Sequence, residues 1–234
     1  MELNMGETKK VKVKVKKRKI KVKRILFCIL FLSLLVLLFL YLKDLPIKNI
    51  YIIGNNILKD KEIIEIANLS NYPSFINTSN REIIKKLEKN EYIKKVTIKK
   101  KFYNKIYIYI TENKILSSYN DKLLLESGEY IDNKYNITSA PILISDITSI
   151  KDKFVSKFSL VKDDILLKIS EIEYTPNEVD NERFSLQMND GNLVYITLSK
   201  ITKINKYNSI YSEMEGKKGI IYLDSGDYIE VKEE

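Results

Sequence analysis

The residues that could do chemistry in this sequence are few, and their types exclude the common catalytic arrangements. The chain holds no histidine, and its single cysteine, Cys28, lies within a long apolar run. Serine–histidine–aspartate triads and cysteine–histidine pairs are therefore excluded, as are most zinc sites, because these need histidine or several cysteines. The lone cysteine also excludes a disulfide within one chain.

Two kinds of candidate catalytic group remain. A serine–lysine dyad stays open, although the Ser-Met-x-Pro box of signal peptidases is absent. Asp163-Asp164 and the pair Glu171 and Glu173 could serve acid–base chemistry, but acidic pairs in mostly polar stretches are more often solvated than catalytic. We therefore predict that the protein is not an enzyme and has no cofactor, metal or small-molecule substrate. Binding is the class of function that remains.

The positive charge of the chain is concentrated at its N-terminus. Residues 1–24 hold eleven Lys and Arg residues against Glu2 and Glu7, whereas the rest of the chain holds 29 basic and 29 acidic residues. A DNA-binding domain needs its basic excess on a folded surface, so no nucleic-acid partner is expected. We interpret residues 1–24 as a solvated basic cytoplasmic tail attracted to anionic lipid, although their alternating pattern also fits a strand. A DNA-binding tail is the remaining alternative, and it would bind in a salt-sensitive way.

Residues 25–42 are the clearest structural signal, an uncharged run of eighteen residues with only Ser33 as a polar interruption. As a helix this run covers roughly 27 Å, close to the hydrocarbon thickness of a bilayer. A cleaved signal peptide would be shorter and would end in a small-x-small site, which the sequence after Leu42 does not offer. Because the basic flank precedes the span, we expect a single-pass type II protein of the cell membrane, with residues 43–234 outside.

Residues 46–112 are predicted to form an α+β domain, and its first three elements are a strand and two helices. The strand covers residues 47–53 and stops at the turn cluster Gly54-Asn55-Asn56. Asp60 is the expected N-cap of the first helix. The second helix begins where a serine and a glutamate three residues later, at 79 and 82, have capping-box spacing.

Two further strands complete this predicted unit. Residues 96–101 and 105–112 alternate apolar and polar side chains, and the loop between them is short enough for a hairpin. A β-α-α-β-β unit of this kind is a small sheet with two helices covering one face. An exposed edge of such a sheet can accept a strand from a partner, which favours a binding role.

Residues 113–232 are predicted to form a second domain, β-rich with mixed α/β content. Asn189-Asp190-Gly191 is the strongest hairpin signal in the chain, because Asp-Gly readily supplies the positive φ angles of a tight turn. Residues 150–169 could be helical, and residues 199–214 place apolar side chains at helical spacing. Two strands joined at Ser225-Gly226 finish the chain.

The ordered set of short motifs resembles a POTRA domain of the FtsQ/DivIB type, a family of bacterial cell division proteins. In the first half the matching pieces are Ile50-Tyr51-Ile52-Ile53-Gly54-Asn55, Phe75-Ile76, residues 83–87, Ile93-Lys94-Lys95-Val96 and residues 106–112. In the second half they are residues 124–128, Pro141-Ile142-Leu143, residues 190–196, residues 200–204 and Tyr222-Leu223-Asp224.

This resemblance implies a non-enzymatic scaffold of the divisome, enriched at the division septum. It implies binding of small single-pass proteins of the FtsB/DivIC and FtsL types through the C-terminal sheet edge, residues 219–231. The side chains expected to make the contact are Ile221, Tyr222, Leu223, Tyr228 and Ile229. A membrane-tethered sensor or transport-assembly factor built on the same POTRA unit is the alternative.

Overall fold

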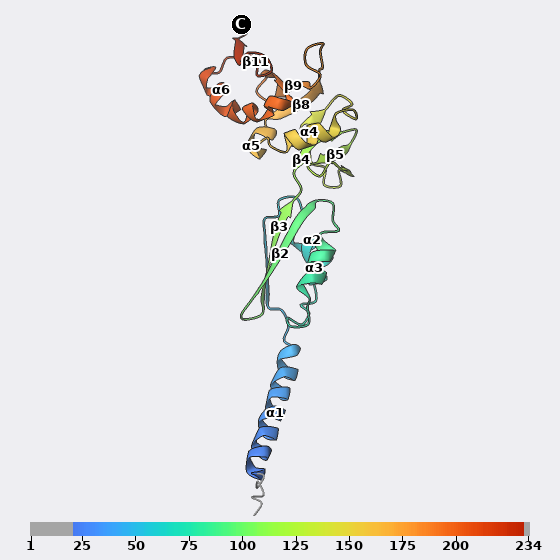
Figure 1. The fold of residues 1–234 in the computed structure, drawn as a ribbon, viewed down its shortest axis with the longest axis vertical. Helices are drawn as coiled ribbons and strands as arrows, with labels where there is room; N and C mark the ends of the chain where they lie inside the picture. The colour runs from blue at the N-terminus through green and yellow to red at the C-terminus, as the bar shows by residue number, and fades with distance from the viewer. Residues whose placement is uncertain (1–20, 232–234) are drawn as a thin grey trace, which may run out of the picture.

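The computed structural model describes residues 21–231, so residues 1–20 of the expected basic tail lie outside the described part of the chain. An apolar helix, a small domain with a three-stranded sheet and a larger domain with a nine-stranded sheet follow one another along the longest axis (Figure 1). The predicted fold class is confirmed: α+β, with one N-terminal apolar helix, a β-α-α-β-β unit and a β-rich mixed α/β part.

Helix α1, Val22–Lys43, contains the whole apolar run and extends slightly beyond both of its ends. It is exposed along its length, and it is long and apolar enough to cross a membrane. The hydroxyl of Ser33 donates a hydrogen bond to the carbonyl oxygen of Leu30 at 2.8 Å. This bond satisfies the polar hydroxyl in the middle of the apolar run without a partner from elsewhere.

The small domain has the predicted element order. Its elements are β1 (Asn49–Ile53), α2 (Asp60–Ile66), α3 (Asn80–Leu87), β2 (Ile93–Lys101) and β3 (Lys105–Glu112). Strand β3 lies in the middle of the sheet, parallel to β1 and antiparallel to β2, and α2 and α3 pack against one face (Figure 1). Ile106, Ile108 and Ile110 alternate inward from β3 and are buried beneath those helices.

The two predicted helix starts differ in outcome. Ser79 caps α3, because its side chain accepts a hydrogen bond from the backbone N–H of Glu82. Asp60 was expected to cap α2, but it is the first residue of that helix, and its carboxylate accepts from the side-chain amide of Asn55 at 2.9 Å. An acidic residue in the first turn still interacts favourably with the positive end of the helix dipole.

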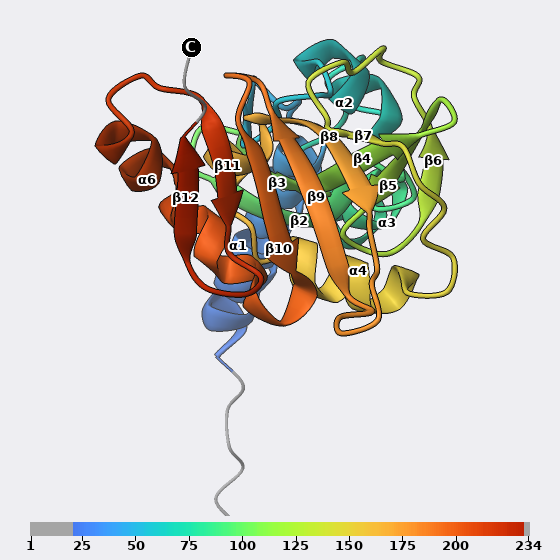
Figure 2. The same ribbon diagram turned by 90° about the horizontal axis from the view of Figure 1, so that it is seen from above.

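The larger domain is built on one sheet with strand order β12-β11-β10-β9-β8-β7-β4-β5-β6. Its helices α4, α5, α6 and η1 lie on one side of the sheet, and Figure 2 looks onto the sheet with α4 below and behind it. The core between the layers contains the rings of Phe154, Phe158 and Phe184. The elements are β4 (Ile115–Tyr119), β5 (Lys122–Leu125), β6 (Tyr130–Asp132), β7 (Ile142–Leu143), α4 (Lys151–Phe158), α5 (Asp163–Leu166), β8 (Ile169–Tyr174), β9 (Arg183–Met188), β10 (Leu193–Thr197), η1 (Leu198–Lys206), α6 (Tyr207–Glu213), β11 (Gly219–Tyr222) and β12 (Tyr228–Val231).

The helical stretch expected over residues 199–214 has two parts. It begins as a 3₁₀-helix, η1, and continues as α6. The buried residues of its first part are spaced by three: Leu198, Ile201, Ile204 and then Tyr207. A period of three matches the three residues per turn of a 3₁₀-helix, so this spacing keeps all four side chains on the core side.

The two domains share a packed boundary. Leu123 and Leu125 of β5, together with Ile131 of β6, belong to the apolar cluster of the small domain, whereas Leu124 points into the core of the large one. The hydroxyl of Tyr92 donates to the carbonyl oxygen of Asp132 at 2.7 Å across the same boundary. Side-chain packing therefore continues across residue 113. The predicted start of a second domain at that residue stays a prediction.

Candidate partner-binding edge

Strand β12 is the outermost strand at one end of the large sheet, and all four of its residues are exposed. The outer side of an edge strand presents unpaired backbone N–H and C=O groups to which another strand can bond. Pairing with β11 puts Tyr228 opposite Tyr222 and Ile229 opposite Ile221. Since side chains alternate along a strand, Tyr228 lies on the open face of the sheet, and Ile229 and Val231 lie on the helix side.

The structure divides the five residues expected to contact a partner. Ile221 and Leu223 are only 1% and 5% exposed and belong to the core of the large domain. The expectation for these two needs correction, because their side chains face inward and stabilise the fold. Tyr222 is half-buried, while Tyr228 and Ile229 are 46% and 37% exposed. For these three, partner contact stays a prediction.

A ladder of rings crosses the open face and ends at the edge. The guanidinium carbon of Arg183 lies 3.8 Å from the ring centre of Tyr195, which stacks on Tyr222 at 5.5 Å. Tyr222 stacks in turn on Tyr228, with ring centres 4.5 Å apart and planes 15° from parallel. Partial desolvation and the nearby carboxylate of Glu230 raise the pKa of Tyr222. Tyr228 is therefore supported on one side by the ring of Tyr222 and exposed on the other.

The turn between β11 and β12 is tied to the rest of the domain by ion pairs. Arg183 Nε lies 2.7 Å from a carboxylate oxygen of Asp224, and Lys203 Nζ lies 2.6 Å from that of Asp227. Lys200 Nζ also donates to the backbone carbonyl of Asp224. Burial alone would raise the pKa of Asp224, but hydrogen bonds from Arg183 and Ser225 outweigh it and hold that pKa below its ordinary value.

A buried amide positions the start of β11. Asn192 is fully buried, donates to the hydroxyl of Tyr207 at 3.0 Å and accepts from the backbone N–H of Gly219 at 2.8 Å. The hydroxyl of Tyr207 donates in turn to the carboxylate of Asp190. Burial is the main cause that raises the pKa of Tyr207, followed by this carboxylate. Sequence reasoning missed the network; the only signal was the tight turn at Asp190-Gly191 beside it.

At Gly219 the backbone of β12 leaves no room for a side chain on β11. A Cβ built at this residue would lie 2.4 Å from the carbonyl oxygen of Glu230, so any side chain there would push the two strands apart. The edge is therefore fixed from inside by Asn192 and kept close on its outer side by a glycine. Among residues 21–231 there is no cluster of three or more Asp, Glu, His or Cys that could hold a metal ion. What this arrangement can do chemically is add a strand and bury apolar side chains.

Comparison with known proteins agrees with this architecture. Residues 45–113 match the family described as "POTRA domain, FtsQ-type". The "Cell division protein DivIB" of Bacillus subtilis (strain 168) is 32% identical over 194 residues, covering 79% of this chain and 73% of that protein. The protein of the same name from Bacillus cytotoxicus is 31% identical and covers 78% and 75%. The chain belongs to the DivIB family of cell division proteins.

A solved structure is also similar. It is the major extracytoplasmic domain of the cell division protein DivIB from Geobacillus stearothermophilus, in its trans isomer, at 21% identity. The similarity covers 45% of this chain and 96% of the other with a TM-score of 0.37, which is too low to add to the argument about the fold. The resemblance inferred from the motifs is confirmed by the family match, and α1 fits a membrane-anchored member of the DivIB family.

Proposed function

We propose that this protein is a non-enzymatic scaffold of the divisome that captures small single-pass division proteins of the FtsB/DivIC and FtsL types at β12. The observation that supports this proposal is the exposure of apolar side chains on both faces of one edge strand. Tyr228 lies on the open face, with Ile229 and Val231, 37% and 45% exposed, on the other. Edge strands normally carry charges or are covered, because an apolar edge invites pairing with another chain.

Strand addition at this edge would use two sources of affinity. The unpaired backbone groups of β12 would extend the sheet by hydrogen bonding, and the side chains on either face would bury apolar area against the partner. The stacked rings of Tyr222 and Tyr228 would be rigid anchors, so little side-chain entropy is lost when the partner binds. The family relationship favours a partner from the division machinery over the sensor or transport-assembly alternative.

The proposed placement in the cell follows from α1 and the charge distribution. The basic residues before α1 favour a cytoplasmic N-terminus, with both folded domains outside the membrane. Domain boundaries near residues 46–112 and 113–232 belong to the same proposal. A fluorescent protein fused to the N-terminus should then gather at midcell during division, and a uniform membrane signal from a functional fusion would contradict the divisome role.

Capture of the small partners tests the edge directly. The full-length chain and its variants Tyr228→Glu and Ile229→Glu are each co-expressed with the tagged partners and purified in detergent. We expect each substitution to weaken capture by about tenfold or more, the effect of losing one anchor worth roughly 1.4 kcal/mol. The two variants probe opposite faces of β12.

The matched control is Val179→Glu, because Val179 is 96% exposed in the loop between β8 and β9 and the substitution makes the same apolar-to-acidic change. This control should capture the partners as well as the parent does. Equal capture by all four proteins would refute the role of β12, provided that their thermal unfolding coincides. If Tyr228→Glu weakens capture and Ile229→Glu does not, the partner lies on the open face of the sheet and does not add a strand to β12.

A further inference from the structure

The tip of the β2–β3 hairpin exposes two aromatic side chains that the fold does not use. Phe102 is 92% exposed and Tyr103 is 81% exposed. Tyr103 has a φ of +64°, in the left-handed region where glycine or asparagine would be favoured. A bulky ring at such a position adds backbone strain and gains no burial in return. The folded domain alone gives no reason for these two residues.

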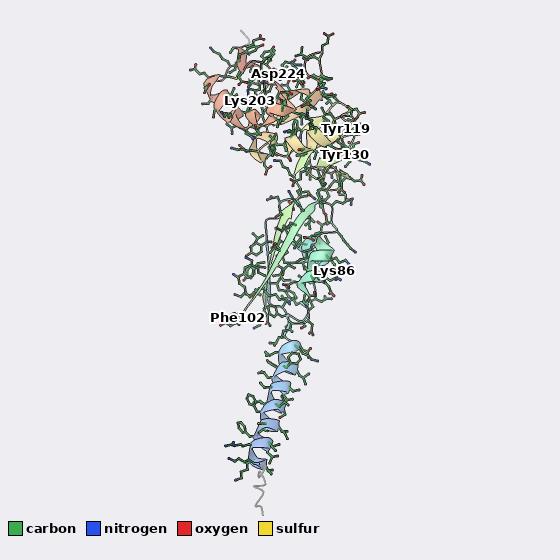
Figure 3. All side chains as sticks on the ribbon, in the orientation of Figure 1. Lys86, Phe102, Tyr119, Tyr130, Lys203 and Asp224 are labelled. Atoms are coloured by element: carbon green, nitrogen blue, oxygen red, sulfur yellow. The ribbon has the colours of Figure 1, made fainter. Side chains whose placement is uncertain are left out.

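Hydrogen bonds hold this tip beside the end of α1. The side-chain amide of Asn104 donates to the carbonyl oxygen of Pro46 at 2.9 Å, and the backbone N–H of Lys48 donates to the carbonyl oxygen of Asn104 at 2.9 Å. Pro46 lies three residues after Lys43, the last residue of α1, so the extended chain between them spans at most about 11 Å. In Figure 3, Phe102 is at the end of the small domain nearest α1.

The segment between helix and hairpin is itself fixed to the domain. The backbone N–H of Phe75 donates to the carbonyl oxygen of Leu45 at 2.9 Å, and the N–H of Ile47 donates to that of Pro73 at 3.0 Å. Ser74 forms a further hydrogen bond with the carbonyl oxygen of Lys43. With the linker held in this way, the position of α1 determines where the tip lies.

Three lysines lie on the same hairpin as the exposed rings of Phe102 and Tyr103. Lys99 and Lys101 are exposed on the open face of the small sheet, where their ammonium groups lie over the rings of Tyr109 and Tyr107 at 5.4 and 4.5 Å. Lys105 is paired with Lys101 across the hairpin. Within the described residues, 21–231, these three lysines take part in no ion pair. Their charge complements anionic headgroups, which attract basic groups near a membrane surface.

We infer that this hairpin tip, Phe102 and Tyr103 with Lys101 and Lys105, is a second membrane contact that inserts its rings into the headgroup region of an anionic lipid surface. Aromatic side chains favour the membrane–water interface, and lysines beside them strengthen attachment to anionic lipid. Two points of contact, α1 and the tip, would restrict how the small domain rotates about the helix. This inference depends on the proposed placement of α1 across a bilayer.

The absence of tryptophan from the sequence makes a direct test available. The full-length variant Phe102→Trp carries a single tryptophan and is reconstituted into vesicles of phosphatidylcholine with phosphatidylglycerol. The matched control is Val179→Trp, which replaces another almost fully exposed apolar residue in the β8–β9 loop at the far end of the molecule (Figure 1). Either orientation of insertion places the hairpin beside a bilayer, so mixed orientation does not affect the comparison.

We expect the tryptophan emission of the Phe102→Trp variant to shift to the blue and to be quenched by lipids that carry a spin label near the headgroup. The Val179→Trp variant should show neither effect. Adding Lys101→Glu and Lys105→Glu to Phe102→Trp should reduce the quenching in vesicles that contain phosphatidylglycerol.

Flotation of the vesicles separately reports insertion of α1, so a chain that does not float refutes the proposed anchor. If the chain floats and the emission of the hairpin variant resembles that of the Val179→Trp control, the inference is refuted. Protection of the hairpin tryptophan only after a division partner is added would also refute it, in favour of a protein contact.

Discussion

Replacing Gly219 by alanine should loosen the pairing of β12 with β11 while leaving the rest of the large domain folded. The new Cβ would lie 2.4 Å from the carbonyl oxygen of Glu230 and 3.2 Å from the Cα of Val231. Both are backbone atoms, so no side chain can rotate away to relieve the contact. Strand β11 is held from inside by the bond between its Gly219 N–H and Asn192. We therefore expect the exposed strand, β12, to move.

The size of the effect can be estimated from packing energetics. Overpacking costs about 1–3 kcal/mol. If that cost falls on the β11–β12 pairing, local opening of β12 becomes easier by the same amount, and exchange of its protected amide hydrogens should accelerate roughly 5- to 150-fold. Global unfolding should change little, because all four residues of β12 are exposed and add little to the core. Partner capture should weaken to the extent that β12 opens.

Hydrogen exchange of the full-length chain, followed by mass spectrometry of the peptide that contains residues 228–231, measures this opening. Gly216→Ala is the matched control: Gly216 has a φ of +82°, but a Cβ there meets nothing within 4 Å. That substitution should cost roughly 1 kcal/mol of backbone strain without pushing on β12. If Gly219→Ala exchanges β12 amides no faster than Gly216→Ala does, close approach at Gly219 does not hold the edge in place, and the reasoning fails.

Three further predictions concern the supports of the site and of the small domain. Asn192→Ala should lower the free energy of unfolding in urea by about 1–3 kcal/mol, because it leaves the N–H of Gly219 buried without its acceptor; an unchanged midpoint would contradict the network. The pKa of Asp224 is lower in the folded state, so the stability it adds is present above about pH 4 and is lost as pH falls below that value. In urea unfolding measured across this pH range, the Arg183→Leu variant should lose less stability on acidification than the parent does. Gly54→Ala should destabilise the small domain by more than Gly128→Ala in thermal unfolding. Both have positive φ, but only at Gly54 would a Cβ collide, 2.3 Å from the carbonyl oxygen of Ile110; equal losses would contradict a steric origin.

Local features of the chain were predictable because their physical causes are local. The apolar run defines α1 by its length, since about twenty apolar residues span a bilayer wherever they occur. Ser79 caps α3 because the serine–glutamate spacing needs only one turn of helix. The hairpin at Asn189-Asp190-Gly191 forms as predicted between β9 and β10, with Gly191 at a φ of +91°. Asp60 shows the limit of this reasoning, because a residue suited to the cap position can equally occupy the first turn.

The candidate site depended on tertiary structure in a different way. The side chains of the C-terminal strands alternate between two faces of the sheet, and the sequence did not indicate which of the two faces is buried in the core. Packing against η1 and α6 decided it: Ile221 and Leu223 turn inward, and Tyr222 turns to the open face. Ile229 pairs with the buried Ile221 on the core side and is still 37% exposed, which the alternation pattern does not predict.

By itself, then, the sequence determined the long apolar helix, the order of elements and the family, because these follow from composition, period and short motifs read along the chain. The tertiary structure alone decided that β12 lies at an edge of the large sheet, that Asn192 joins β11 to α6, and that β5 serves two cores at once. Each of these is a contact between residues far apart in sequence. Such contacts depend on which surfaces the folded layers bring together, a property that no local pattern records.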